Sequence, residues 1–445
     1  MPVFLHVLGL AVFAQGTSEF MLSGLVPDLA HDLHVSTAAA GGLTSAYAIG
    51  MIVGAPLTAA LSARWPRRPA LAGFLAAFVL VHVVGALATD FVVLFATRVV
   101  AAVVNAGFLA VALPFAAGLV EPPRRARATA VLLSGVTLAC VVGVPAGALL
   151  GETYGWRSAF WSVAALCLPA LALVLRSPAA ATPDGPPIPD AAPTPDAAAR
   201  PEVSTHPDAA TGPDAAPGPD APPRPDASTH PDTPPRPDVS VRRDLGVLAS
   251  RPLRTALGVA ALVNGATFAT FAFLAVVAED VARLPSGAVP GLLAAFGAGA
   301  FLGVTAAGRM APGAGPGAAL RYGRRAFGAL TAGWVLLALT AVHPVTLFLL
   351  AAVQGALSFG LGTALVSRVL RLASGAPVLA GAFATVGLNT GAFAGPLLAA
   401  AATGRTGAPV TAVWTSAVLA AAAALLTAVD RARSHRRGKT TPTRT

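Results

Sequence analysis

Long apolar runs and short polar connections alternate along the chain, with one long interruption near its middle. Runs of about 20 apolar residues, the length that crosses a bilayer as a helix, recur in two sets of six. The predicted spans cover residues 4–27, 40–62, 70–88, 92–119, 129–150 and 158–175 in the first set, and residues 253–277, 289–308, 325–342, 345–367, 377–402 and 409–429 in the second. This pattern predicts an all-α membrane protein with twelve transmembrane helices in two six-helix bundles.

The segment between the two sets is polar and repetitive. From Asp184 to Asp238, an acidic residue preceded by proline returns every six residues. Repeated proline prevents a regular helix, and the segment has too little apolar surface to fold by itself. We therefore predict four parts, namely an N-terminal bundle over 1–176, a disordered linker over 177–250, a C-terminal bundle over 251–430 and a basic tail over 431–445. The linker is interpreted as a spacer, and a docking site for a partner is the alternative.

The composition agrees with a membrane protein, and the distribution of charge indicates its orientation. Of the 445 residues, 55% are hydrophobic and only 11% are charged, which is about half the charged fraction of soluble proteins. If the N-terminus is cytoplasmic, 26 of the 30 lysines and arginines lie on the cytoplasmic side, as the positive-inside rule expects. We therefore predict a multi-pass protein of the inner (plasma) membrane with both termini in the cytoplasm. This topology explains the net charge of +10, so we expect no nucleic-acid partner.

Few residues in the sequence indicate any other chemistry. It contains no P-loop, catalytic triad or His/Cys metal-binding pattern, so we predict neither an enzyme nor a bound cofactor or metal. Cys140 and Cys167 both fall in apolar spans, and we interpret them as small buried side chains rather than as a disulfide.

Two charged residues lie well inside predicted spans. Glu19 comes nine residues before Asp28, which marks the outer end of the first span, and Arg98 comes eight residues after Asp90, which marks the outer end of the fourth. Both are therefore roughly 12–13 Å below the outer ends of their helices, and each is expected to compensate the other, directly or through water. A static ion pair between helices is one interpretation. We favour a second, in which Glu19 takes a proton from one side of the membrane and releases it to the other.

Glycine and proline are concentrated in the fifth and eleventh spans. In the fifth span they are Gly135, Gly143, Pro145, Gly147 and Gly151. In the eleventh span they are Gly381, Gly387, Gly391, Gly395 and Pro396. Small residues four or eight positions apart allow close helix packing, and their recurrence in both halves is typical of an internal structural repeat.

Other polar and aromatic residues are candidates on weaker grounds. Three arginines in the loop after the second span either clamp a helix end or serve as topology charges; they are Arg64, Arg67 and Arg68. Amides and aromatic rings within spans either connect helices or line a substrate site. As substrate-binding candidates we take Gln15, Asn105, Asn264, Phe271 and Asn389. His82 in the third span is interpreted as a neutral, hydrogen-bonded side chain, with a proton relay as the alternative.

Together these features resemble the major facilitator superfamily, and within it the drug:proton antiporter branch with twelve spans. The resemblance covers about residues 1–176 and 245–430. It is most specific in three strings, which are similar to actinobacterial chloramphenicol-efflux transporters: GTSEFMLSGLVPDLAHDLHVS, AGGLTSAYAIGMIVGAP and GVTLACVVGVPAGALLGETYGWRSAFW. The loop after the second span departs from the family pattern, because Ala59, Ala63 and Pro66 stand where the family has glycine, aspartate and a second glycine.

The resemblance implies roles for particular residues. It assigns the membrane acid of the family to Glu19, the fourth-span arginine to Arg98, and the antiporter motif to Gly135, Gly143, Pro145 and Gly147. The implied function is efflux of a small amphipathic drug, above all chloramphenicol or another phenicol, in exchange for protons. The implied mechanism is alternating access by a monomer in the lipid bilayer. The alternatives are a sugar or metabolite exporter on the same scaffold and a non-transporting membrane receptor or scaffold.

Overall fold

The computed structural model describes residues 3–62, 65–121, 124–176, 241–310, 316–376 and 379–439, and the described parts of both halves belong to one compact unit. In the first half the longer helices are α1 (Val3–Phe20), α4 (Leu43–Ser62), α5 (Arg67–Ala86), α6 (Phe91–Gly118), α7 (Arg125–Leu138), α8 (Val144–Tyr154) and α9 (Arg157–Arg176). The short elements are η1 (Met21–Gly24), α2 (Val26–Asp32), α3 (Thr37–Gly41) and the π-helical η3 (Ala139–Gly143), which joins α7 to α8.

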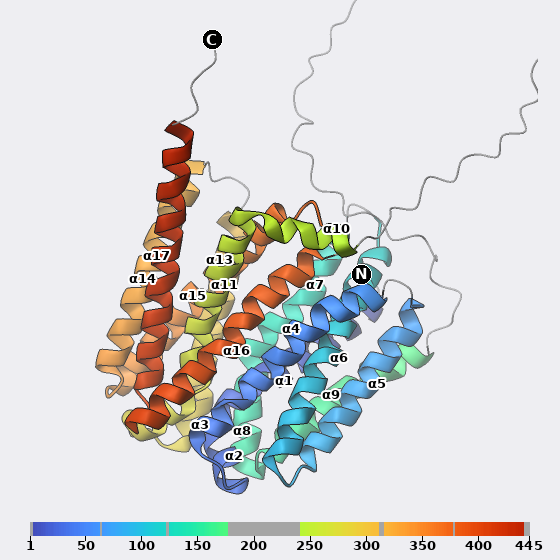
Figure 1. Cartoon of the computed structure of the whole chain (residues 1–445). Helices are drawn as coiled ribbons and strands as arrows, with labels where there is room; N and C mark the ends of the chain where they lie inside the picture. The colour runs from blue at the N-terminus through green and yellow to red at the C-terminus, as the bar shows by residue number, and fades with distance from the viewer. Residues whose placement is uncertain are drawn as a thin grey trace, which may run out of the picture. The chain divides into compact units, whose positions relative to one another are not determined.

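The second half is also helical (Figure 1). Its long helices are α11 (Arg251–Phe271), α13 (Val289–Met310), α14 (Pro316–Thr340), α15 (Pro344–Leu372), α16 (Ala380–Thr406) and α17 (Thr411–Lys439). The short elements are α10 (Val241–Gly246), η5 (Val247–Ala249), α12 (Leu274–Val276), η6 (Val277–Val281) and η7 (Ser286–Ala288).

The helices have the length and apolar character that a membrane requires. Within the described ranges, ten helices could cross a bilayer, and α11 with its continuation through η6, bent by 45°, makes an eleventh. A shorter apolar helix lies within α14, at Arg325–Thr340. The predicted all-α membrane fold is confirmed, and these helices are consistent with the predicted twelve spans.

Helical structure in the second half begins earlier and ends later than the predicted boundaries. The expected linker lies outside the described residues up to residue 240, but residues 241–249 form α10 and η5. Asp244 of α10 is buried and accepts a hydrogen bond from the backbone N–H of Leu379 at 3.2 Å. This bond fastens the segment to the turn before α16. At the other end, α17 continues to Lys439, beyond residue 430, where we expected the tail to begin.

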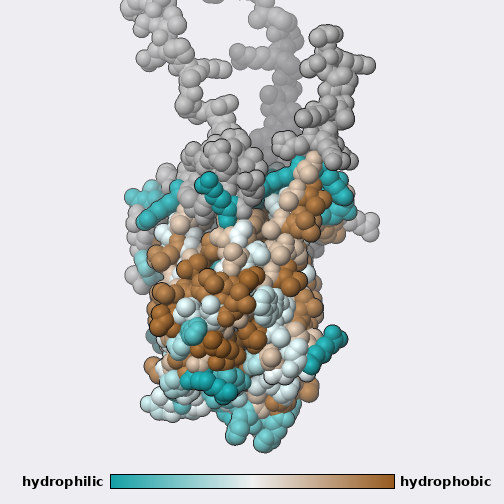
Figure 2. Space-filling view, turned by 90° about the vertical axis from the view of Figure 1, so that its left-hand side faces the viewer, coloured by the Kyte–Doolittle hydropathy of each residue, from teal (hydrophilic) through white to brown (hydrophobic). Residues whose placement is uncertain are grey.

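The surface of the helices is apolar where lipid would contact it. On the face that carries α14 and α17, apolar residues dominate the middle and hydrophilic residues gather toward the ends (Figure 2). Leu339, Val418 and Leu425 of these helices expose 64%, 66% and 66% of their surface. Exposing such side chains to water costs on the order of 25 cal/mol per Å². The chain is therefore a multi-pass membrane protein.

Equivalent helices of the two halves pack in the same way. α1 lies against α7 and η3, and α11 lies against α16. A Cβ atom at Gly143 would overlap the side chain of Thr17 in α1, and a Cβ atom at Gly391 in α16 would overlap the backbone of α11 at Ala261. In each half, a glycine-rich face thus brings two helices into close contact, as expected for an internal repeat.

The two halves meet along two sets of helices, α4 with α16 and η3–α8 with α13. Ser45 of α4 donates a hydrogen bond to the backbone carbonyl of Phe393 at 2.9 Å. In the second contact, Gly297 of α13 approaches the backbone of Cys140 so closely that a Cβ atom would overlap it. Residues of both halves can therefore form one site between them.

Candidate substrate and proton site

Glu19 lies one residue before the end of α1, where the chain continues as the 3-10 turn η1. Its side chain is half-buried, whereas the next residue, Phe20, is buried. Glu19 is within electrostatic reach of Arg98 in α6, Tyr47 in α4 and Cys140 in η3. A half-buried carboxylate can exchange protons with water and still interact electrostatically with buried residues.

Arg98 is 1% exposed, and its hydrogen bonds go to the residue before Glu19. One terminal guanidinium nitrogen donates to Ser18 Oγ at 2.8 Å, and the other donates to the Ser18 backbone carbonyl at 2.5 Å. The guanidinium carbon lies 4.7 Å from the centre of the Tyr47 ring, within the range of a cation–π interaction. Within the part of the chain that the structure describes, no ion pair joins Arg98 to Glu19.

Of the two forms of compensation expected from the equal depth of Glu19 and Arg98, the direct ion pair is not present among the described residues. Equal depth does not fix which way two side chains point, and the guanidinium binds the Ser18 peptide and hydroxyl instead. Compensation of the two charges through water stays a prediction.

His82 of α5 extends this buried network. Its Nδ1 lies 2.8 Å from the Phe78 backbone carbonyl, and its Nε2 lies 2.6 Å from Ser18 Oγ. The ring is 1% exposed. The interpretation of His82 as a hydrogen-bonded side chain is confirmed.

Three further side chains in this region have buried polar atoms without a hydrogen-bond partner among the described residues. Gln15, one helical turn before Glu19, is 1% exposed and neither of its amide atoms is paired. The Tyr47 hydroxyl lies beside Asn105 but outside hydrogen-bond geometry, and Asn105 Oδ1 is also unpaired. Because buried polar atoms are nearly always paired, such a group is typical of a place that holds water or a polar part of a ligand.

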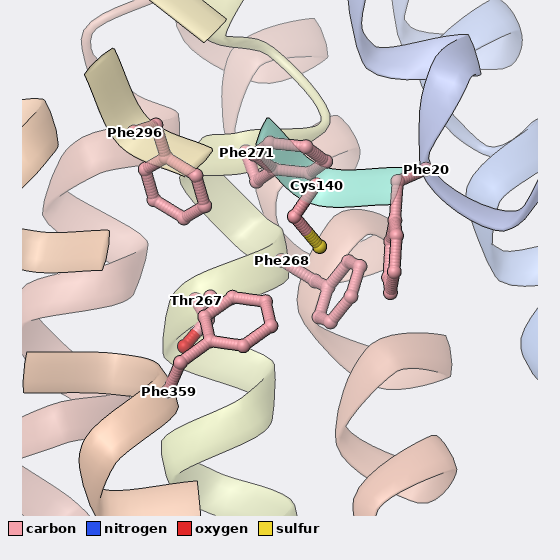
Figure 3. A pocket seen from close by; sticks show the side chains of 7 residues that line it. All are labelled: Phe20, Cys140, Thr267, Phe268, Phe271, Phe296 and Phe359. Carbon is pink, nitrogen blue, oxygen red and sulfur yellow. The ribbon is translucent and has the colours of Figure 1, made fainter. Parts of the chain in front are cut away.

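An aromatic pocket lies next to this polar region, between the two halves (Figure 3). Its lining residues are Phe20, Cys140, Thr267, Phe268, Phe271, Phe296 and Phe359. They come from α1 and η3 of the first half and from α11, α13 and α15 of the second. Figure 3 shows the thiol of Cys140 directed toward the rings of Phe20 and Phe268. Glu19 directly precedes Phe20 and is within electrostatic reach of Cys140, so the carboxylate belongs to the neighbourhood of this pocket.

Phe271 is central to the contacts among these rings. Its centroid lies 4.8 Å from Phe296, 5.9 Å from Phe268 and 6.3 Å from Phe20, which are favourable distances for aromatic pairs. The free space between the rings is about 10 Å³, roughly the room that one water molecule needs. A drug-sized ligand would therefore have to separate rings that belong to different halves.

The antiporter motif faces the helix that carries Glu19. A Cβ atom at Gly135 would lie 2.8 Å from the backbone nitrogen of Phe13 in α1, and one at Gly147 would lie 3.3 Å from Cβ of Met21 in η1. Pro145 lies in the first turn of α8, directly after the π-helical turn η3. The motif therefore permits close contact along α1, and its part in transport stays a prediction.

The predicted substrate residues do not all meet at the pocket. Phe271 lines it, and Gln15 and Asn105 belong to the polar region of the first half. Asn264 donates to the Leu388 carbonyl at 2.8 Å and so connects α11 to α16. Asn389 donates to the Thr385 carbonyl of its own helix at 3.0 Å. Asn264 thus connects two helices, Asn389 bonds within its own helix, and both lie outside the pocket lining.

The predicted loop motif is only partly described. Arg64 lies outside the described residues. The Arg67 side chain extends toward Gly118, at the C-terminal end of α6, where a positive charge is favourable. Arg68 is half-buried in the first turn of α5. The clamp interpretation agrees with the position of Arg67, and the role of the motif stays a prediction.

Sequence reasoning missed most of the pocket. Phe20 could have been found, because it follows the predicted acid directly. Phe296 and Phe359 lie in otherwise ordinary apolar spans, so only the rotation of α13 and α15 identifies them. Ser18 was missed because a lone serine in a span is usually a helix contact.

The comparison with known proteins agrees with this architecture. The Major Facilitator Superfamily matches residues 8–315. A chloramphenicol resistance protein of Streptomyces lividans is 48% identical over 432 residues, which cover 96% of this chain and 95% of that protein. The chain belongs to the Major Facilitator Superfamily. The resemblance that the sequence motifs indicated is confirmed.

Two further proteins are similar to this chain, one in part of its sequence and one in its fold. A chloramphenicol efflux pump of Mycobacterium tuberculosis is 38% identical over 164 residues, 37% of this chain and 38% of the pump. A crystal structure of a mutant of the nucleoside transporter NupG has a TM-score of 0.67 and covers 96% of this chain and 98% of its own, at 12% identity. At that identity the likeness shows the fold alone. Membership in this superfamily makes transport of a solute the class of function.

Proposed function

We propose that this chain exports chloramphenicol or another phenicol from the cytoplasm in exchange for protons. The observation that carries the proposal is the phenylalanine-lined pocket between the two halves, with the half-buried Glu19 directly before the lining residue Phe20. The names of the Streptomyces and Mycobacterium relatives support the choice of chloramphenicol. The protein would work as a monomer in the inner membrane, with both termini in the cytoplasm.

In this proposal the pocket and the carboxylate act in turn. The phenylalanine rings bind the apolar aromatic part of the drug, because stacked and edge-to-face rings at 5–6 Å are favourable. The unpaired amide and hydroxyl groups of Gln15, Asn105 and Tyr47 then pair with its polar groups or with water. A proton on Glu19 removes the negative charge at the edge of the pocket. Proton and drug therefore compete for the site. Proton binding promotes release of the drug, and drug binding promotes release of the proton.

Alternating access requires that the two halves move about this site. Filling the pocket separates Phe20 from Phe268 and Phe271, which belong to the other half. The glycine face of α7–α8 allows α1 to shift along it, because few side chains interlock there. Arg98, in electrostatic reach of Glu19, sets how readily the carboxylate takes up a proton.

The test is drug accumulation in cells that express the wild type, Glu19→Gln or the matched control Glu121→Gln. Glu121 is an exposed carboxylate in the α6–α7 connection. The wild type and the control should keep chloramphenicol out of energised cells, and a protonophore should abolish this. Glu19→Gln should fail to expel the drug. Equal export by Glu19→Gln, unaffected by the protonophore, would refute the proton role, and absence of phenicol export by the wild type would refute the substrate.

The residues that line the pocket also distinguish a phenicol from a sugar as the substrate. Sugar sites rely on several amides and an indole platform, whereas this pocket is lined by five phenylalanines, one threonine and one cysteine. No tryptophan is among the residues that line this pocket. The chemistry of the pocket thus favours an aromatic drug over a sugar.

A further inference from the structure

His82 is a buried ionisable side chain that the proposed exchange of drug and proton does not use. It lies on α5 between Phe78 and Phe160, with ring centroids 4.2 Å and 5.9 Å away. Its two nitrogens are both within hydrogen-bond distance of a partner. Because α5 does not line the pocket, His82 can influence the site only through the residues that it contacts.

The chemistry of the partners fixes the direction of each hydrogen bond. The Phe78 carbonyl can only accept, so Nδ1 of His82 carries the hydrogen at 2.8 Å. Nε2 of the neutral ring is then an acceptor, and the Ser18 hydroxyl donates to it at 2.6 Å. With its hydrogen directed to His82, Ser18 Oγ has lone pairs free to accept from the Arg98 guanidinium at 2.8 Å. Arg98, Ser18 and His82 thus form a hydrogen-bond chain, in which each group donates to the next and His82 donates to the Phe78 carbonyl.

This hydrogen-bond chain determines where the Arg98 guanidinium lies. Arg98 makes two hydrogen bonds to Ser18, one to the hydroxyl and one to the backbone carbonyl, and stacks over Tyr47. The carboxylate of Glu19 belongs to the very next residue but receives neither bond. We propose that His82 is a positioning residue of the proton site, which acts through Ser18 to hold Arg98 on the Ser18 peptide and away from the Glu19 carboxylate. The inference rests on the proposed role of Glu19 as the proton carrier.

Of the groups that surround Glu19 and Arg98, Arg98 is the one that can change how readily Glu19 binds a proton. Glu19 is faced by Tyr47 from α4, Cys140 from η3 and Arg98 from α6. Arg98 is faced by Tyr47 and by His82 from α5. Tyrosine and cysteine are uncharged near neutral pH. Among the described residues that face Glu19, Arg98 is thus the cation that can neutralise it, and the position of the guanidinium decides whether the carboxylate stays available for protons.

Loss of this hydrogen-bond chain should change the pH dependence of transport and not only its rate. Without a fixed hydroxyl acceptor, the guanidinium loses one of its two bonds to Ser18 and can turn to the adjacent carboxylate. An ion pair favours the charged carboxylate, so loading a proton would require a higher proton concentration. We expect the midpoint of the pH profile of drug–proton exchange to move to lower pH by about one unit.

The experiment uses the full-length protein in proteoliposomes and measures drug-driven proton movement from about pH 5 to about pH 9. Ser18→Ala and His82→Asn break the chain, since alanine lacks the hydroxyl and asparagine is too short to reach Ser18. Ser18→Thr keeps the hydroxyl, and His82→Gln places an amide oxygen near the position of Nε2. His6→Asn, an exposed histidine on α1, is the matched control.

The expected result is a profile shifted to lower pH in Ser18→Ala and His82→Asn, with recovery toward the wild-type midpoint in Ser18→Thr and His82→Gln. Profiles of Ser18→Ala and His82→Asn that superimpose on the wild type would overturn the positioning role. A lower rate at an unchanged midpoint would also overturn it, because a purely structural role predicts that outcome. The inference fails separately from the proposed proton role of Glu19, which is lost if Glu19→Gln still couples drug to protons.

Discussion

Phe20 at the end of α1 stacks on Phe268 of α11, with ring centroids 5.8 Å apart and planes inclined by 28°. One ring belongs to each half of the molecule, and the residue before Phe20 is the predicted proton carrier Glu19. Entry of a ligand between these rings would therefore change both the contact between the halves and the surroundings of the carboxylate. In the proposed function, this relationship would couple drug binding to proton release.

Replacing Phe271 with alanine should weaken drug binding more than it weakens the fold. Phe271 contacts the rings of Phe20, Phe268 and Phe296, and an aromatic pair contributes about 0.5–1.5 kcal/mol beyond its buried area. We expect the apparent affinity for chloramphenicol to fall about three- to tenfold, measured by binding to purified protein. Phe301→Ala is the control, because this phenylalanine is on the outer surface of α13 and 49% exposed. Equal losses in both variants would contradict a substrate role for the pocket.

Gly143→Ala should impair transport by forcing α1 away from η3. A Cβ atom at this position overlaps the Thr17 side chain, and overpacking of this kind costs on the order of 1–3 kcal/mol. Chloramphenicol export should fall strongly at normal expression, and Thr17→Ala in the same chain should restore part of it. Gly73→Ala is the control, since a Cβ atom there meets no neighbour within 4 Å. If Gly143→Ala exports normally, the close approach of α1 is not needed for transport.

Chloramphenicol should protect Cys140 from alkylation. The Cys140 thiol lines the pocket, whereas Cys167 is fully buried in a hydrophobic cluster outside the pocket lining. In a Cys167→Ala background, a small maleimide should label the protein slowly and the drug should slow labelling further, as followed by intact mass. In a Cys140→Ala background, the drug should make no difference. Drug-independent labelling of Cys140 would place the ligand elsewhere.

The exposed Asp32–Arg157 pair of the first half should make stability depend on acidic pH. Hydrogen bonds from the Trp156 indole at 2.9 Å and from Arg157 hold the pKa of Asp32 below its usual value. A lowered pKa stabilises the fold above the unfolded value, about pH 4, and this contribution disappears as the pH falls through the folded pKa.

Asp32→Asn should therefore lower the thermal midpoint at neutral pH and remove part of the acid sensitivity below about pH 4. The loss at neutral pH should be small, below about 1 kcal/mol, because both side chains are substantially exposed. Thermal unfolding in detergent at several pH values measures it. Asp90→Asn is the matched control at the start of α6, where either residue can accept the bond from Val93. A difference between wild type and Asp32→Asn that does not vary with pH would contradict the linkage.

Much of the fold follows from the sequence, because lipid imposes a local requirement on each span. A bilayer demands about 20 apolar residues with internally satisfied backbone, so the spans of both halves can be read from composition. The glycine faces of α7–α8 and α16 are equally local, since spacing along one helix fixes which residues share a face. The depth of Glu19 and Arg98 was also determined in this way.

Only the tertiary structure decided which of these groups meet. Two charges at equal depth were expected to compensate each other directly or through water, yet Arg98 binds Ser18, and His82 of a third helix joins the network. The pocket likewise draws single rings from α1, α13 and α15, and nothing in each separate span distinguishes them from lipid-facing phenylalanines. Sequence determines which residues lie at a given depth, whereas the rotation and packing of whole helices determine which of them touch, because side-chain interactions extend only a few ångströms.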